Sequence, residues 1–161
     1  MSRTISVLVD NQPGVLARIT GLVARRGFNI ESLAVSHTES SAKSRVTMVV
    51  DADSEIVEQV TKQLHKLINV YKVNDLSETE HIDRELVLFK VNAEPAKRGE
   101  IIELAGIFRA KIVDVSPTSL TVEMTGDDNK LDAMEDLLRG YGIKQIVRGG
   151  KIAISRGGGG A

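Results

Sequence analysis

The feature that most constrains this chain is one arrangement of apolar residues that occurs twice, about eighty residues apart. In each half, short runs rich in valine and isoleucine are followed by stretches in which apolar residues recur every three or four positions. The short runs are typical of strands and the longer stretches of helices. Both halves therefore predict the order strand, helix, strand, strand, helix, strand.

The expected elements follow from these runs. In the first half, strands are expected over residues 5–9, 28–36, 46–51 and 70–76, and helices around the apolar stripes of residues 15–23 and 56–67, with Ser54 as the N-cap of the second. In the second half, strands are expected over residues 86–93, 112–115, 120–125 and 143–154, the last interrupted by Gly149 and Gly150, and helices around residues 101–108 and 131–138.

This order is the split βαβ arrangement of ferredoxin-like folds, in which two helices cover one face of a four-stranded antiparallel sheet. The fold class is therefore α+β, with two tandem ferredoxin-like βαββαβ units. We expect a first domain over residues 1–78, a polar linker over 79–84, a second domain over 85–156 and a flexible glycine-rich tail over 157–161.

The strand segments SVLVD and VTMVVD do not alternate cleanly between apolar and polar residues. Such runs indicate that both faces of the strands are buried. A lone unit with helices on one face leaves its other face and its edge strands uncovered, whereas pairing with a second copy covers them. We therefore expect at least a homodimer.

The composition excludes several classes of protein. The chain has 161 residues, 21 basic and 22 acidic, and a net charge of −1, which argues against a general binder of nucleic acid or membrane surfaces. It has no cysteine, so disulfides and thiolate sites are absent. No signal-peptide pattern and no apolar run of membrane-spanning length occurs. We expect a cytoplasmic protein.

Catalytic motifs are scarce. The three histidines, His37, His65 and His81, have no metal-ligand spacing, and GxSxG, SxxK, Walker and GxGxxG sequences do not occur. The pairs Asp51/Asp53 and Asp127/Asp128 flank expected helix starts, where they favour the helix N-terminus. Few aromatic residues are available to stack on RNA bases. We expect no catalytic residue and no metal site.

The stretch NQPG, between the first strand and the first helix, is the best candidate for a binding site. Asn11 is a capping residue type, and Pro13 suits a first helical turn because its φ is fixed and it lacks an N–H group. Gly14 has no side chain, so a ligand can approach the backbone there. Free N–H groups of Gly14, Val15 and Leu16 would attract a carboxylate.

Asn29, at the start of the next strand, offers both a donor and an acceptor. Together with the helix end, it could hold a small molecule that carries a carboxylate and an ammonium group. The residues alone nevertheless favour a simpler interpretation, in which NQPG is only a turn and Asn29 only begins a strand.

A resemblance to a known family adds to this interpretation. The stretch ISVLVDNQPGVLARITGLVARRGFNIESLAVSHTES resembles the ACT domain that opens the small, regulatory subunit of acetohydroxyacid synthase, also called acetolactate synthase. SRVTMVVDAD, KQLHKLINVYKVNDL, RELVLFKV, IFRAKIVDVSPTSLTVEMTG, KLDAM and ISRG continue the similarity. It covers nearly the whole chain but not the glycine-rich tail.

The resemblance implies a regulatory subunit that is not itself a catalyst. Its partner would be the large subunit, which carries thiamine diphosphate, FAD and Mg²⁺ and condenses 2-oxo acids in branched-chain amino-acid biosynthesis. The small subunit would raise that activity and confer allosteric feedback inhibition by valine, with leucine or isoleucine as weaker effectors. The chain itself would carry no cofactor.

The family's effector sites lie where two ACT units meet. The matching positions here are Asn11, Gly14, Val15, Leu16, Asn29 and Ile30. By this resemblance, Asn11 and Asn29 bind the polar head of the effector, and the backbone of residues 14–16 binds its carboxylate. Ile30 contributes its main chain or an apolar wall.

The sequence is compared with two other possible functions, a free-standing sensor and an independent enzyme. A free-standing ACT sensor that acts on another target, such as a transcriptional regulator, is disfavoured because no basic DNA-binding helix is evident. An independent enzyme lacks a catalytic constellation. The sequence leaves open whether the second unit dimerises, contacts the large subunit, or does both.

Overall fold

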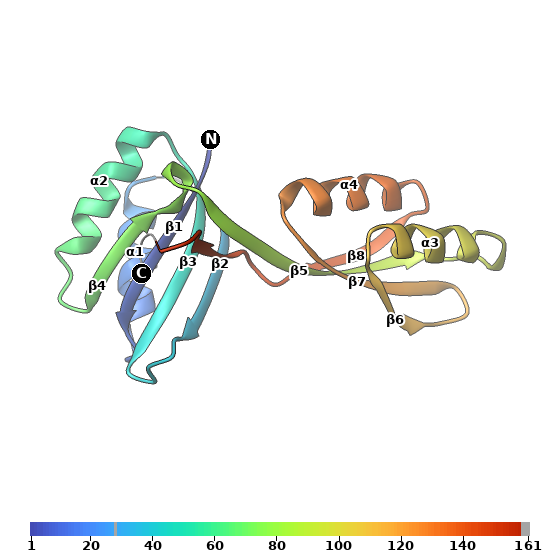
Figure 1. Ribbon diagram of the computed structural model, residues 1–161, viewed down its shortest axis with the longest axis horizontal. Coiled ribbons are helices and arrows are strands. Elements are labelled where there is room, and N and C mark those ends of the chain that lie inside the picture. The colour runs from blue at the N-terminus through green and yellow to red at the C-terminus, as the bar shows by residue number, and fades with distance from the viewer. Residues whose placement is uncertain (28, 159–161) are drawn as a thin grey trace. The chain divides into compact units, whose positions relative to one another are not determined.

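The computed structural model describes residues 1–27 and 29–158, and these residues form two compact units. The first unit comprises Met1–Ile82 together with the segment that begins at Lys151, and the second comprises Asp83–Gly150. Each unit is an antiparallel sheet with two helices on one of its faces (Figure 1). The α+β class and the repeated βαββαβ order are therefore confirmed.

The first unit contains the elements predicted from the sequence. They are β1 (Ser2–Asp10), α1 (Val15–Arg25), β2 (Ile30–His37), β3 (Lys43–Asp51), α2 (Ser54–His65), β4 (Val70–Asp75) and a short 3₁₀ helix, η1 (Leu76–Glu78). The strand order is β2-β3-β1-β4, so β2 lies at one edge of the sheet. Phe28, the first residue of the predicted second strand, lies outside the described residues.

Both helices of the first unit pack on the sheet through residues three or four positions apart. Val15, Ile19 and Val23 of α1 are buried, and α2 buries Val57, Val60 and Leu64. The core between the helices and the sheet includes Ile5, Val7, Val46 and Met48. The predicted N-cap of α2, Ser54, is wrong, because the Asp53 side chain accepts the hydrogen bond from the Ile56 amide, at 3.1 Å. Asp53 and Ser54 are both common N-cap residues, so the sequence could not separate them.

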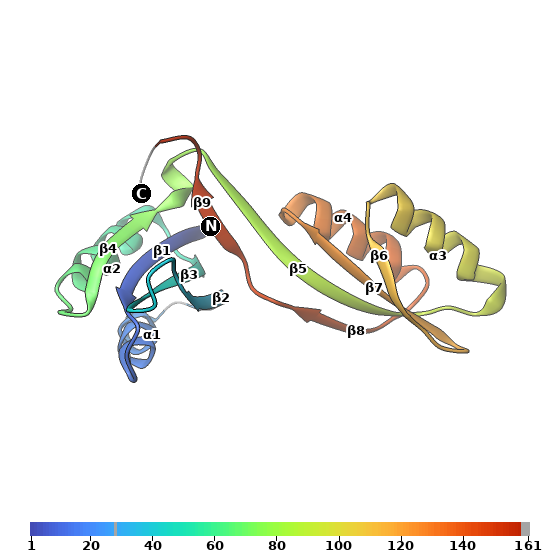
Figure 2. The same ribbon diagram turned by 60° about the horizontal axis from the view of Figure 1, so that its bottom comes forward.

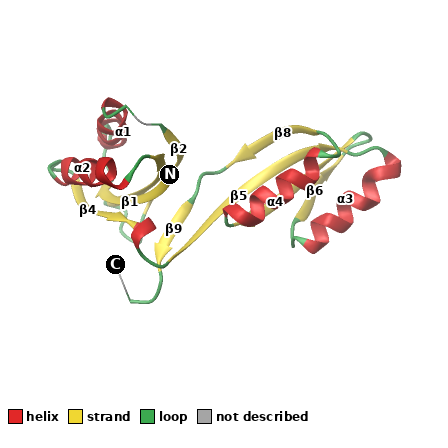
Figure 3. Ribbon diagram, turned by 90° about the horizontal axis from the view of Figure 1, so that it is seen from above, coloured by secondary structure: helices red, strands yellow, loops and turns green. Residues whose placement is uncertain are grey.

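The second unit repeats the pattern. Its elements are β5 (His81–Asn92), α3 (Pro95–Ile107), β6 (Lys111–Val115), β7 (Ser119–Gly126), α4 (Asp128–Arg139) and β8 (Ile143–Arg148), in the strand order β6-β7-β5-β8. Helices α3 and α4 lie on the same face of this sheet (Figure 3). Phe89, Ile101 and Met134 are among the buried side chains of its core.

The boundaries between the units differ from those drawn on the sequence. Strand β5 begins at His81, so most of the expected linker, residues 79–84, is strand. The chain leaves β8 through Gly149 and Gly150 and forms β9 (Ile152–Ser155), which pairs with β5 (Figure 2). This segment groups with the first unit, whereas residues 85–156 were expected to form the second domain. Residues 159–161 of the expected tail lie outside the described residues.

Specific hydrogen bonds hold the returning segment. The Lys151 amide donates to Ser32 Oγ on β2 at 2.8 Å, and the Arg156 amide donates to the Glu80 carbonyl at 3.0 Å. A four-residue strand carries no pattern that tells which sheet it joins, because the hydrogen bonds that place it come from distant residues.

The same segment bears on the burial of the first sheet. On the face away from the helices, Ser6 is 2% exposed and Thr47 is 3% exposed. Two segments of the same unit reach this face or its rim, since Lys151 bonds to Ser32 and the Thr4 amide bonds to Ser77 Oγ at 2.8 Å. The chain therefore buries these positions by itself, and the premise that a single copy cannot do so is wrong. The homodimer stays a prediction that rests on the edge strand β2.

None of the described helices is long and apolar enough to cross a membrane.

Candidate functional site

The loop between β1 and α1 forms an open helix N-terminus. Gly14 is the N-cap residue, with φ of 84°, and no side chain caps the first turn. This left-handed backbone favours glycine, and a Cβ added to Gly14 would meet no atom within 4 Å. The space beside the Gly14 backbone is thus unobstructed, and binding of a ligand there stays a prediction.

The backbone amide groups in the first turn of α1 differ in whether they have a hydrogen-bond partner. The Val15 amide points to the Gln12 carbonyl at a long 3.4 Å, while the side chain of Val15 is buried in the core. Leu16 is 38% exposed, and its amide lies in the first turn, where an α-helix offers no carbonyl partner. The first turn contains no acidic residue, so nothing in it offsets the partial positive charge of the helix end.

Asn11 does not act as a helix cap. Its side-chain Nδ2 donates to the Ser41 carbonyl at 2.9 Å, and its main-chain amide donates to the Ala42 carbonyl at 2.9 Å. Both bonds anchor the loop to the hairpin between β2 and β3. In the described part of the chain no donor reaches Asn11 Oδ1, so this oxygen can accept a hydrogen bond from a ligand.

Three residues that the sequence did not single out hold the other side of the loop. Asp10 Oδ1 accepts a hydrogen bond from the Tyr71 hydroxyl at 2.5 Å, and Asp10 Oδ2 accepts one from Asn69 Nδ2 at 2.8 Å. The hydrogen bond from Tyr71, followed by that from Asn69, holds the pKa of Asp10 below its usual value. The bond to Asp10 in turn raises the pKa of Tyr71. We call Asp10, Asn69 and Tyr71 the loop brace.

The loop brace extends to two neighbouring cations. Arg18 Nη1 of α1 donates to Asn69 Oδ1 at 2.9 Å, and Lys43 Nζ lies 4.4 Å from the centre of the Tyr71 ring. No short sequence motif predicts this hydrogen-bond network, because its bonds join residues about sixty positions apart.

Asn29 and Ile30 lie far from the loop within one chain. Asp10 pairs with Lys43 at one end of β3, whereas Ile30 pairs with Val50 near the other end. Lys43 and Val50 are seven positions apart along β3, which corresponds to about 24 Å. Helix α1, which connects the loop to Asn29, is about 16 Å long. One copy of the chain does not bring the two predicted halves of the site together.

The environments of Asn29 and Ile30 differ from each other. The side chain of Asn29 is exposed, and its carbonyl accepts a long hydrogen bond of 3.4 Å from the Asp51 amide. Ile30 is partly buried against the core of the first unit. The polar group at this end is therefore accessible, while the Ile30 side chain has mainly a packing role.

The remaining candidates have structural surroundings. His37, His65 and His81 belong to β2, α2 and β5, and the described residues contain no cluster of side chains that could hold a metal ion. Asp53 caps α2, and the Asp127 carboxylate caps α4 by accepting from the Lys130 amide at 3.0 Å. The predicted role at helix starts is confirmed for Asp53, Asp127 and Asp128, whereas Asp51 ends β3 and its carboxylate pairs with the Met1 amino group at 2.6 Å.

The repeated βαββαβ fold and the N-terminus of α1, capped only by Gly14, define the class of protein: the first unit is an ACT-type domain. Residues 5–72 match the family model described as the AHAS small subunit-like ACT domain, and residues 84–157 match the model described as the small subunit of acetolactate synthase. The chain belongs to the acetolactate synthase small-subunit family, which is the family predicted from the sequence.

Similar proteins extend over almost the entire chain. A probable acetolactate synthase small subunit of Archaeoglobus fulgidus is 57% identical over 157 residues, which is 98% of each chain. The acetolactate synthase small subunit of Mycolicibacterium smegmatis is 51% identical over 97% of this chain and 92% of its own. The crystal structure of the small subunit from Thermotoga maritima has a TM-score of 0.87 and 38% identity, with 98% of both chains covered.

Proposed function

We propose that this chain is the regulatory partner of an acetolactate synthase large subunit, which it activates and renders sensitive to feedback inhibition by valine. Thiamine diphosphate, FAD and Mg²⁺ would reside on the large subunit, and a cytoplasmic location remains part of this prediction. Support comes from the family to which the chain belongs and from the subunit names of its relatives.

One observation carries the effector site: its two predicted halves lie at opposite ends of the first unit. The backbone around Gly14 and the free oxygen of Asn11 suit a carboxylate and an ammonium group, respectively. Asn29 lies about 24 Å further along the sheet, beyond the reach of a single amino acid bound at the loop. A second copy, docked in the opposite direction, would place its Asn29 beside the loop of the first.

The edge position of β2 supports such a pairing. In the described residues no further strand pairs with the outer edge of β2, and Val35 on this strand is 44% exposed. Edge-to-edge pairing of two copies about a two-fold axis would place the start of each β2 near the partner. We propose a homodimer with two equivalent effector sites, each formed by the residues 11–16 of one copy and Asn29 and Ile30 of the other.

A site shared in this way suits control of an enzyme. Valine bound between two copies stabilises one arrangement of them, and allosteric coupling of this kind typically amounts to about 1–3 kcal/mol. Selectivity among branched-chain amino acids is expected to be modest, because one methylene contributes only about 1–3 kcal/mol in an apolar pocket.

Reconstitution tests the function as a whole. The chain is mixed with its large subunit, acetolactate formation is measured, and valine is titrated. We expect activation in the absence of valine and saturable inhibition in its presence. Failure to activate the large subunit would refute the regulatory role.

A mixing experiment tests the shared site. Asn11→Ala and Asn29→Ala chains each fail to bind valine alone, since every site in either dimer has lost one half. After exchange of subunits, a mixed dimer has one doubly altered site and one intact site. Calorimetry should then recover about a quarter of the wild-type binding capacity, as half of the dimers carry one intact site of two. A site confined to one chain would recover none.

A further inference from the structure

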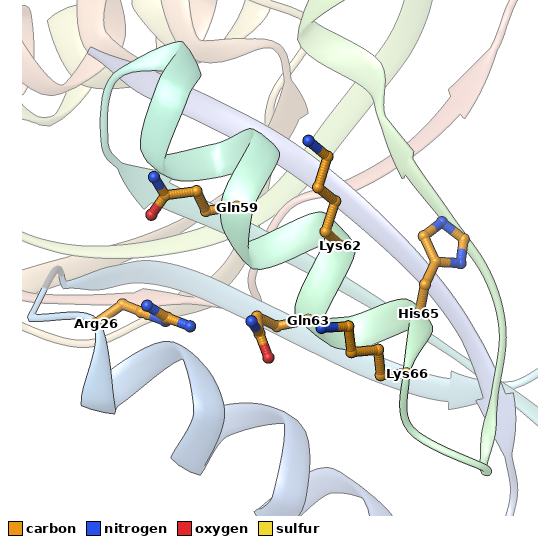
Figure 4. A pocket seen from close by; sticks show the side chains of 6 residues that line it. All are labelled: Arg26, Gln59, Lys62, Gln63, His65 and Lys66. Carbon is orange, nitrogen blue, oxygen red and sulfur yellow. The ribbon is translucent and has the colours of Figure 1, made fainter.

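A hollow lies between α1 and α2, on the layer of helices that covers the first sheet. Six side chains line this hollow, which has a volume of about 530 Å³: Arg26, Gln59, Lys62, Gln63, His65 and Lys66. Figure 4 shows Arg26 extending from the end of α1 toward Gln63 on α2. We call this hollow the basic groove.

The basic groove has an excess of positive charge. Arg26, Lys62 and Lys66 are cationic at neutral pH, and none of its lining residues is acidic. Lys62 Nζ pairs with Glu58 Oε1 at 3.1 Å, but both side chains are about two-thirds exposed, so this pair is weak. Within the described part of the chain, Arg26 and Lys66 have no ion pair. The whole chain has a net charge of −1, so the excess is local.

Helix dipoles explain only part of this arrangement. Arg26 directly follows α1, and Lys62 lies in the last turn of α2, where cations favour the partial negative charge of a helix end. The dipole does not account for the hollow or for its glutamines. Gln59, Lys62, Gln63 and Lys66 follow the spacing i, i+3, i+4, i+7 and so form one stripe along α2.

This stripe is distinct from the face that α2 buries. Val57, Val60 and Leu64 pack against the sheet, so the polar stripe points away from the core. Its side chains leave the helix one turn apart, with about 6 Å between successive Cβ atoms, and they combine ammonium groups with amide donors and acceptors. Such a surface matches carboxylates that follow one another at a similar spacing on a partner.

We propose that the basic groove is a docking surface for an acidic segment of the large subunit; this inference rests on the proposed function. A small anion fits less well, because most of the lining side chains are exposed and water would screen its charge. Nucleic acid also fits less well, since no aromatic side chain lines the groove for stacking. Charge complementarity of this kind governs the rate and orientation of protein association.

The test reverses the charge of the stripe and measures affinity for the large subunit. The variant is Lys62→Glu/Lys66→Glu, and the matched control is Lys97→Glu/Lys144→Glu, which changes the net charge equally at exposed positions of the second unit. We expect the dissociation constant of the first variant to rise roughly tenfold or more, while the control changes by less than about threefold. Equal affinity of the groove variant and wild type would overturn the proposal, as would an equal loss in the control.

Further measurements separate the possible failures. Binding of valine to the isolated chain should be unchanged in the groove variant, since Lys62 and Lys66 belong to neither half of the effector site. A wild-type chain that does not bind the large subunit refutes the proposed function itself rather than the groove alone. Retention of single-stranded RNA by the wild type, lost in the groove variant while binding of the large subunit is kept, assigns the groove to nucleic acid and overturns the proposal.

A second variant guards against misfolding. Lys62→Gln/Lys66→Gln keeps good helix formers at both positions and only removes charge. We expect a smaller loss of affinity and a weaker dependence of the dissociation constant on salt than in wild type. A salt dependence identical to that of wild type would contradict the role of these two lysines.

Discussion

A carboxylate placed at position 14 should abolish valine inhibition, and the structure allows its effect to be separated into parts. Gly14 has φ of 84° and free space around a would-be Cβ, so substitution strains the backbone without a steric clash. For Gly14→Ala, the left-handed conformation costs about 1–2 kcal/mol, partly offset by about 0.4–1 kcal/mol from the stiffer unfolded chain. The net loss of stability should be about 1 kcal/mol.

Gly14→Asp and Gly14→Asn add larger effects at the site. Asn and Asp tolerate the left-handed region better than Ala does, so their strain is smaller. Both side chains can reach the free amides of the first turn and compete with a ligand for them. Only the Asp variant adds a negative charge, and two carboxylates about 5 Å apart repel each other by about 1–3 kcal/mol for dielectric constants between bulk water and a protein surface. Valine affinity should therefore fall by about 5- to 150-fold more in the Asp variant than in the Asn variant.

The assay is valine titration of the reconstituted enzyme, with inhibition expressed relative to the activity of each variant without valine. We expect sensitivity to fall in the order wild type, Gly14→Ala, Gly14→Asn, Gly14→Asp. Equal sensitivity of the Asn and Asp variants would refute the electrostatic reasoning. Wild-type sensitivity of the Asp variant would refute the assignment of the pocket to this loop.

Three further predictions concern stability, each measured by denaturant unfolding. Leu138→Ala should destabilise the second unit by about 2–5 kcal/mol because Leu138 is fully buried. The control Leu137→Ala, at a position of the same helix that is 45% exposed, should change stability by less than about 0.5 kcal/mol. Similar losses in the two variants would contradict the packing described. Asp53→Ala should cost about 1 kcal/mol through loss of the N-cap of α2, and an unchanged midpoint would show that the cap is dispensable. Hydrogen bonds from Tyr71 and Asn69 hold the pKa of Asp10 below its usual 3.8. The Asp10 carboxylate therefore stabilises the fold above about pH 3.8, and this contribution is lost as the pH falls through the lowered pKa. Asp10→Asn should therefore be less stable than wild type at neutral pH, and the difference should shrink in acid; a constant difference would count against this linkage.

Much of the fold could be predicted because its signals are local. The apolar spacing of Val15, Ile19 and Val23 predicts both the existence of α1 and the face that it buries, and the structure confirms both. Gly14 marks the turn before α1 for a local reason too, since its φ of 84° suits glycine best. Element boundaries were less accurate, as the early start of β5 at His81 shows.

The candidate site was only partly predictable. The residue type at Gly14 indicated a helix end without a side chain, and the structure has one, whereas Asn11, a capping residue type, anchors the loop to the β2–β3 hairpin instead. The loop brace could not be predicted, because Asp10, Asn69 and Tyr71 become neighbours only when β1 and β4 pair. The basic groove likewise combines Arg26 of the first helix region with residues of α2, and no short window contains both.

By itself, the sequence determined the order of the elements, the buried faces of the helices and the family to which the chain belongs. Only the tertiary structure decided that β9 returns to the first unit, and that Asn11 and Asn29 lie at opposite ends of β3. The physical reason is the range of the interactions. Helical periodicity and turn chemistry act over a few residues, whereas strand register and side-chain networks join residues that are far apart in the chain and become neighbours only in the folded protein.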